Sequence, residues 1–241
     1  MNKKRILIIA AAAAAAGLLG WRLLGREFLY AGTVEATEVD ISARVSSVIS
    51  AFAAKEGETV PQGRRLVTLA CEDLNLAADI AHKDFKRAAQ LRQGGSIPQE
   101  AYDRALYRRD DAALRVSWCD IDAPIAGTVL ATYREANELV SPGAKLLTLA
   151  DLREVWAVVY VPQPLLAKLS PGMEVLALLP EAPGARLQGR IAHINDEAEF
   201  TPKNVQTRQE RTRLVFGVKV VFPNPDRLLK PGMTVEVRLP G

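Results

Sequence analysis

The sequence predicts a mainly β protein with an inserted α-helical hairpin. One β-rich segment occurs twice, and the chain between the two copies has the periodicity of helices rather than strands. The copies cover residues 41–70 and 121–151, and the insert covers residues 71–120. From residue 152 onward, apolar and polar residues alternate as in half-buried strands, which extends the β structure to residue 241.

The first 26 residues have the features of a transmembrane signal anchor. A basic flank at residues 3–5 precedes an apolar run at residues 6–21. Extended to Gly25, this run has roughly the 20 residues that a bilayer requires, provided that Arg22 reaches the interface. A cleaved secretory signal is the alternative, and the residues after the run favour it less. The positive-inside rule then predicts that the chain after this segment lies outside the cytoplasm. Residues 27–40 are predicted to form a lead-in strand.

The repeat keeps a constant separation of 80 positions without a gap, as between Gly63 and Gly143. Both glycines lie in turns, where a residue without a side chain can adopt positive φ at no steric cost. One copy cannot bury its own apolar face, whereas two copies clasped together can. The duplication therefore predicts a small β-sandwich whose halves are residues 41–70 and 121–151.

The insert, residues 71–120, is predicted to form two helices. Apolar residues such as Leu74, Ala81 and Phe85 recur at threes and fours between charged residues. The segment 94–96 (GGS) interrupts this pattern, and Pro98 can open a second helix because the first helical turn needs no N–H there. Two helices with a short connection form an antiparallel coiled-coil hairpin.

Several kinds of function are disfavoured. The net charge of +3 with 6% aromatic residues does not indicate a nucleic-acid surface. His82 and His193 are isolated from each other and from metal-ligand spacings, which predicts no metal site. Nucleophile motifs and phosphate-binding loops are missing from the sequence, so neither an enzyme nor a cofactor is expected.

The order of these parts resembles the HlyD-type membrane fusion proteins, also called periplasmic adaptor proteins. The resemblance rests on residues 123–129 (APIAGTV), residues 155–162 (VWAVVYVP), and the Pro-Gly-Met turns at Gly172 and Gly232. It implies a lipoyl-like β-sandwich split by the hairpin and followed by a β-barrel over residues 152–241. The lysine motif of lipoyl and biotinyl carriers is missing from the sequence, so a covalently bound cofactor is not expected.

The resemblance implies an adaptor of a multi-component efflux or secretion system. Such an adaptor is anchored in the inner membrane of a Gram-negative bacterium and bridges an exporter to a TolC-like outer-membrane channel. Residues 201–207 (TPKNVQT) and the strand at 213–222 are similar to the branch that works with ABC-type exporters. An RND-type pump is an alternative partner, and a periplasmic assembly module without an export role is an alternative function. The family also implies a homo-oligomeric ring, often a hexamer.

The resemblance assigns a channel contact to the hairpin tip. Adaptors that meet TolC-like channels carry an Arg, a Leu four residues later and a Ser seven residues further. Arg87 and Leu91 occupy the first two places, whereas Pro98 replaces the Ser. The expected contact residues are Arg87, Leu91, Ile97 and Pro98. Alternatively, Arg87 is an ordinary solvated charge and Leu91 belongs to the seam between the helices.

The two cysteines, Cys71 and Cys119, flank the hairpin on either side. In an antiparallel hairpin these positions meet at the base, within the roughly 4.4–6.8 Å between Cα atoms that a disulfide requires. An oxidising periplasm would preserve such a bond. The alternative is a pair of buried free thiols packed as small apolar groups. The sequence leaves both alternatives open.

Overall fold

The computed structural model describes residues 28–182, 184–200 and 214–240. The expected anchor at residues 1–26 therefore lies outside the described residues, and so does the segment 201–207. Within the described part of the chain, no helix is long and apolar enough to cross a membrane.

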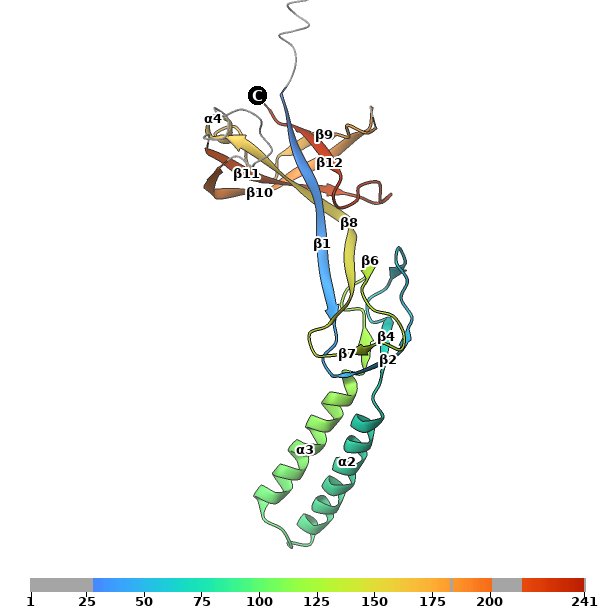
Figure 1. The fold of residues 1–241 in the computed structure, drawn as a ribbon. Helices are drawn as coiled ribbons and strands as arrows, with labels where there is room; N and C mark the ends of the chain where they lie inside the picture. Colours follow the sequence, from blue (N-terminus) through green and yellow to red (C-terminus); the bar gives the residue numbers. More distant parts are fainter. Residues whose placement is uncertain (1–27, 183, 201–213, 241) are drawn as a thin grey trace, which may run out of the picture. The chain divides into compact units, whose positions relative to one another are not determined.

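The chain divides into two compact units (Figure 1). The sandwich unit is Ala36–Arg153, and the barrel unit combines the chain up to Glu35 with Glu154–Gly241. Two long strands, β1 (Leu29–Ser42) and β8 (Lys145–Pro162), each contribute one part to each unit.

The sandwich unit contains the two sequence repeats as reciprocally paired strands. Its four-stranded sheet has the order β5-β4-β2-β7, and β3, β6 and the first part of β8 pair in the order β8-β6-β3. The strands are β2 (Ser47–Phe52), β3 (Thr59–Val60), β4 (Arg65–Ala70), β5 (Asp120–Asp122), β6 (Gly127–Thr132) and β7 (Leu139–Val140).

Each half of the repeat completes the sheet of the other half. Strand β2 pairs with β7 of the second copy, and the equivalent strand β6 pairs with β3 of the first copy. The pairs β2–β4 and β6–β8 have the same register, with an irregularity at the same position. The turns also bind across the two halves: Gly63 N–H donates to Ala123 O, and Gly143 N–H donates to Ala43 O, both at 2.8 Å. The two halves are therefore interlocked rather than merely stacked.

Two equivalent ion pairs cross between the halves. Arg65 lies 2.9 Å from Asp120, and Lys145 lies 2.8 Å from Asp40. Lys145 is the repeat counterpart of Arg65, and Asp40 is the counterpart of Asp120, each 80 positions apart. Hydrogen bonds from Lys145 and Thr148 lower the pKa of Asp40, and the Asp40 carboxylate in turn raises the pKa of Lys145. The repeat thus conserves a charge contact that only the folded arrangement brings together.

Apolar residues from both halves form the core of the sandwich unit. Ile49, Val60 and Leu66 from the first copy and Val129 and Leu149 from the second are fully buried. Each copy places its alternating apolar residues on the inner face, as the half-buried strand pattern predicts.

The turn glycines have left-handed backbone conformations. Gly63 and Gly143 have φ of 79° and 85°, the sign that the turn interpretation requires, and Gly172 and Gly232 have φ of 89° and 90°. Asn137 also has a positive φ, of 72°. Its counterpart in the first copy is a glycine, and asparagine is among the side chains that tolerate this region best.

The insert forms the antiparallel hairpin that the periodicity predicts (Figure 1). Helix α2 spans Glu72–Gln93, and helix α3 spans Gln99–Ser117. Neither helix contains a buried residue. The helices contact each other along one face only, so the hairpin has no core of its own.

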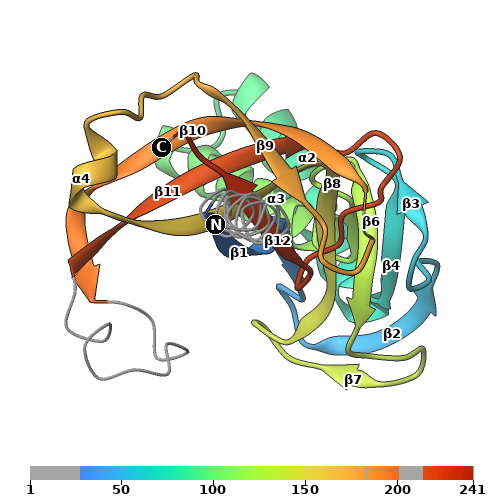
Figure 2. The same ribbon diagram turned by 90° about the horizontal axis from the view of Figure 1, so that it is seen from above.

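The barrel unit is a six-stranded closed barrel in the order β1-β12-β9-β10-β11-β8, with an additional β1–β8 pairing (Figure 2). Gly32 permits this closure, because a Cβ atom there would lie 2.7 Å from the Val158 carbonyl oxygen. The remaining elements are β9 (Glu174–Leu178), β10 (Arg186–Phe200), β11 (Leu214–Pro223), β12 (Thr234–Arg238) and the short helix α4 (Gln163–Leu166).

Replacing Gly63 or Gly143 with alanine should each lower the free energy of unfolding by about 1–2 kcal/mol. Nothing lies within 4 Å of a Cβ built at either glycine, so the loss reflects backbone conformation and not a clash. Chemical denaturation measures it, with Gly94→Ala as the control because Gly94 has an ordinary φ of −84°. Losses at the repeat glycines no larger than the control would contradict the turn interpretation.

Replacing Asp40 with asparagine should flatten the pH dependence of stability on the acid side. The folded pKa of Asp40 lies below its ordinary value of about 3.9, so the carboxylate stabilises the fold above that pH. This stabilisation disappears as the pH falls through the folded pKa. Urea denaturation from pH 6 down to about pH 2 measures the slope, with Asp226→Asn as an exposed control. Equal slopes for Asp40→Asn and the unmodified chain would disprove the linkage.

Candidate functional site: the helical hairpin and its base

The tip of the hairpin is a short hydrogen-bonded turn between α2 and α3. Ser96 N–H donates to Leu91 O at 2.8 Å, and Gly94 N–H donates to Gln90 O at 3.2 Å. Gly95 has φ of 67° and reverses the chain, and Pro98 in an extended conformation precedes the first residue of α3. These contacts satisfy backbone groups that the end of α2 leaves without helical partners.

The structure places the predicted contact residues together at this end. Arg87 forms an exposed ion pair with Asp84 one turn earlier, and Leu91 is 49% exposed. Leu91 is therefore not part of a buried seam, whereas Arg87 has the exposure of a solvated helix charge. Ile97 is half-buried and Pro98 is exposed in the connecting turn. The turn and the last two turns of α2 thus present Arg87 together with apolar surface to the surroundings.

A stack of four side chains joins the two helices near the tip. Arg92 of α2 lies 4.4 Å over the ring of Tyr102 of α3, whose centroid is 5.6 Å from that of Phe85 of α2. Arg109 of α3 in turn lies over the ring of Phe85, 4.1 Å from its centroid. Side chains from α2 and α3 alternate in the stack, which replaces a conventional apolar core. The helical periodicity predicts Phe85 in the seam between the helices. It does not predict the ring contacts of Arg92 and Arg109, because the periodicity places charged residues on the solvated face.

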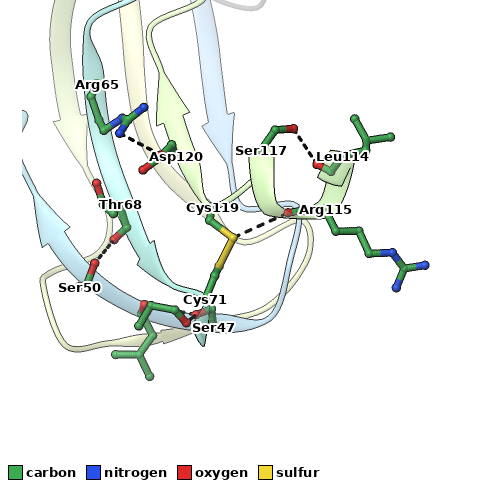
Figure 3. The surroundings of a disulfide bond; sticks show 12 residues. Ser47, Ser50, Arg65, Thr68, Cys71, Leu114, Arg115, Ser117, Cys119 and Asp120 are labelled. Carbon is green, nitrogen blue, oxygen red and sulfur yellow. Dashed lines mark hydrogen bonds and ion pairs between the residues drawn. A yellow bond between two sulfur atoms is a disulfide. The ribbon is translucent and has the colours of Figure 1, made fainter. Parts of the chain in front are cut away.

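The base of the hairpin carries a disulfide between Cys71 and Cys119 (Figure 3). The Sγ atoms are 2.12 Å apart and the Cα atoms 6.2 Å apart, across a sequence separation of 48 residues. Of the two alternatives that the sequence leaves open, the structure contains the bridge. It joins the residue before α2 to the second residue after α3, so α2 begins and α3 ends at one covalent junction.

The bridge is buried in the core of the sandwich unit. Cys71 and Cys119 are 4% and 6% exposed and belong to the same apolar cluster as Leu69. Leu69 N–H donates to Cys119 O at 2.8 Å, which ties the end of α3 to strand β4. Ser47 donates a hydrogen bond to the carbonyl of Ala70, beside Cys71 (Figure 3). The hairpin is therefore fastened to the sheets and not only to itself.

No group of three or more His, Cys, Asp or Glu side chains among the described residues could hold a metal ion. His82 on α2 and His193 on β10 are both exposed and lie in different units. The hairpin presents an extended helical surface in which neither helix has a buried residue.

Comparisons with known proteins agree with the architecture. Residues 154–241 match the family model of the CusB-like β-barrel domain. A chimeric MacA protein that contains the Pseudomonas aeruginosa MexA α-hairpin domain has a TM-score of 0.73 at 18% identity, over 88% of this chain and 80% of that one. The membrane fusion protein Spr0693 of Streptococcus pneumoniae R6 has a TM-score of 0.68 at 19% identity, over 88% and 98%. The chain therefore shares its fold with these two proteins, and the matched barrel model covers the C-terminal part of the chain.

In sequence, the chain is similar to UPF0194 membrane proteins. One from Acidithiobacillus ferridurans, described as encoded in the asrC 5′ region, is 38% identical over 118 residues, and YbhG of Salmonella gallinarum is 35% identical over 116 residues. These matches cover 49% and 48% of this chain. The chain matches only 35% of the length of each relative.

Replacing both cysteines with serine should lower the free energy of unfolding by at most about 4 kcal/mol, since the bridge closes a long loop in the unfolded chain. The double variant avoids the unpaired thiol that a single replacement would leave. Denaturation curves of both proteins measure the difference. Mass spectrometry after alkylation without reduction provides the direct check, and two alkylated cysteines in the native chain would rule the bridge out.

Replacing Tyr102 with alanine should destabilise the tip of the hairpin by about 1–2 kcal/mol, because it removes an aromatic pair and a cation–π contact. Amide hydrogen exchange in α2 and α3 reports this loss locally. Tyr107→Ala is the matched control, since Tyr107 lies on the same helix and is 70% exposed. Similar exchange in both variants would show that the stack contributes nothing.

Proposed function

We propose that this protein is the periplasmic adaptor subunit of a multi-component efflux or secretion system. In this role residues 1–26 anchor it in the inner membrane of a Gram-negative bacterium, with the described residues in the periplasm. The hairpin tip contacts a TolC-like outer-membrane channel, and copies of the chain assemble into a ring, as a hexamer. The carrying observation is the hairpin itself: two helices without a buried residue, fastened covalently at the base, with a cation and apolar surface exposed at the tip.

The proposed channel contact uses Arg87, Leu91, Ile97 and Pro98. The ion pair between Arg87 and Asp84 is exposed, and such pairs contribute little to stability, so the guanidinium can change partner at low cost. Leu91 exposes apolar surface one helical turn further along. A cation next to an exposed leucine suits a groove between helices that offers a carboxylate or carbonyl group and an apolar wall.

The proposed exporter is of the ABC type, with a permease and an ATPase. The similarity of residues 201–207 and of the following strand to the ABC-linked branch supports this choice. An RND-type pump is the second candidate, because the matched barrel model is named for RND systems. Vanadate, which inhibits ABC ATPases, and a protonophore separate the two in export assays. Export that withstands vanadate but stops with the protonophore would favour the RND pump.

A membrane-anchored assembly module without an export role is the remaining alternative. Deleting the gene should abolish export of the transported compound if the adaptor proposal holds. Normal export in the deletion strain, with altered envelope assembly, would favour the alternative.

Replacing Arg87 with glutamate should reduce export and weaken channel binding about thirtyfold or more, because reversing one charge of an interfacial pair costs at least about 2 kcal/mol. Adaptor abundance should not change, since the Arg87 side chain is 73% exposed. Co-purification of the channel and export rates measure the effect.

Lys86→Glu is the matched control for that experiment. Lys86 is the adjacent exposed residue, so its reversal changes the net charge equally on another face of α2. Asp84→Asn tests the loss of the helical ion pair alone. If Arg87→Glu supports wild-type export, or if Lys86→Glu is equally defective, the contact is assigned to the wrong residues.

A further inference from the structure

The barrel unit has an apolar groove of about 620 Å³ where β1 begins and β12 ends. Leu29 and Arg238 are direct partners in the register of these two strands. Helix α4 and the start of β9 complete the walls. The apolar lining includes Phe28, Tyr30, Leu165, Met173 and Leu239.

The aromatic residues of this groove are not used by the barrel core. Phe28 is 72% exposed and makes an edge-to-face contact with Tyr30, at 4.7 Å between the ring centroids. Tyr30 is half-buried, and desolvation raises its pKa. Phe28 is an exposed apolar side chain on the rim of an apolar groove. A further surface that covers it would remove the ring from water, which is energetically favourable.

The position of Phe28 in the chain indicates that the covering surface is the membrane. Only Arg26 and Glu27 separate Phe28 from Gly25, the last residue of the apolar run in the proposed anchor. Even fully extended, three residue steps span about 10 Å. With that run in the bilayer, Phe28 would lie at or near the headgroup region, where aromatic side chains concentrate in membrane proteins.

We propose that this end of the barrel unit docks on the periplasmic leaflet of the inner membrane, with Phe28 and Tyr30 in the interfacial region. The groove then receives part of a phospholipid acyl chain. Glu174 and Arg238 also line the groove, and one charge of each sign matches a zwitterionic headgroup. This docking rests on the proposed function, because the anchor at residues 1–26 brings the groove to the bilayer.

Photolabelling of the full-length chain in proteoliposomes tests the docking. The vesicles contain phosphatidylethanolamine with a fraction of phosphatidylcholine that carries a diazirine in its acyl chain. After irradiation, mass spectrometry should find lipid adducts on residues 28–30 and 173–176 as well as on residues 6–25. Phe28→Glu should reduce the groove adducts several-fold.

Leu214→Glu is the matched control. Leu214 is an apolar residue of the same unit, is 54% exposed, and does not line the groove. Its replacement should leave the groove adducts unchanged. Retention of the disulfide and of the circular dichroism spectrum shows that each variant is folded.

The outcomes separate the docking from the anchor. Adducts on residues 6–25 without adducts in the groove would overturn the docking and leave the anchor intact. If neither region is labelled, both the anchor and the docking are wrong. Groove adducts that Phe28→Glu and Leu214→Glu reduce equally would show unspecific labelling and would also overturn the docking.

Discussion

The reciprocal exchange of strands between the two sequence repeats is the constraint on which the sandwich unit depends. Strand β2 needs β7 from the second copy, and β6 needs β3 from the first. Neither copy can therefore fold into a complete sheet alone. The chain that leaves the first copy has to return beside it, and β4 and β5 are neighbours in the same sheet. Any insert between the copies must accordingly start and end at one point, which is the geometry of an antiparallel hairpin.

The hairpin itself offers little burial to stabilise it. None of its helical residues is buried, so association of the two helices in isolation would be weak. Stability is concentrated instead at two places: the disulfide inside the sandwich core, and the Arg–Tyr–Phe–Arg stack near the tip. The first limits splaying of the helices where they leave the sheets. The second holds the far end together while leaving Arg87 and Leu91 exposed.

The barrel unit also depends on pairing between strands that are far apart in the sequence. Its first strand, β1, comes from before the repeats, and the others follow them, so closure requires β1 to meet β8. Gly32 provides the space for that approach. Because β1 starts at the rim of the barrel, Phe28, the described residue that precedes it, lies beside the groove.

The sequence by itself determined the repeat, the hairpin, the turn glycines and the meeting of Cys71 with Cys119 at the hairpin base. These follow from periodicity, turn chemistry and connectivity, which record local backbone preferences and the buried face of each element. Only the tertiary structure decided that the thiols are bridged, that Leu91 is exposed, and that Arg92 and Arg109 stack on rings. It also decided the crossed ion pairs of Asp40 and Asp120. Such contacts join residues far apart in sequence or on facing helices, and a charge pattern alone does not distinguish a solvated side chain from one that covers an aromatic ring.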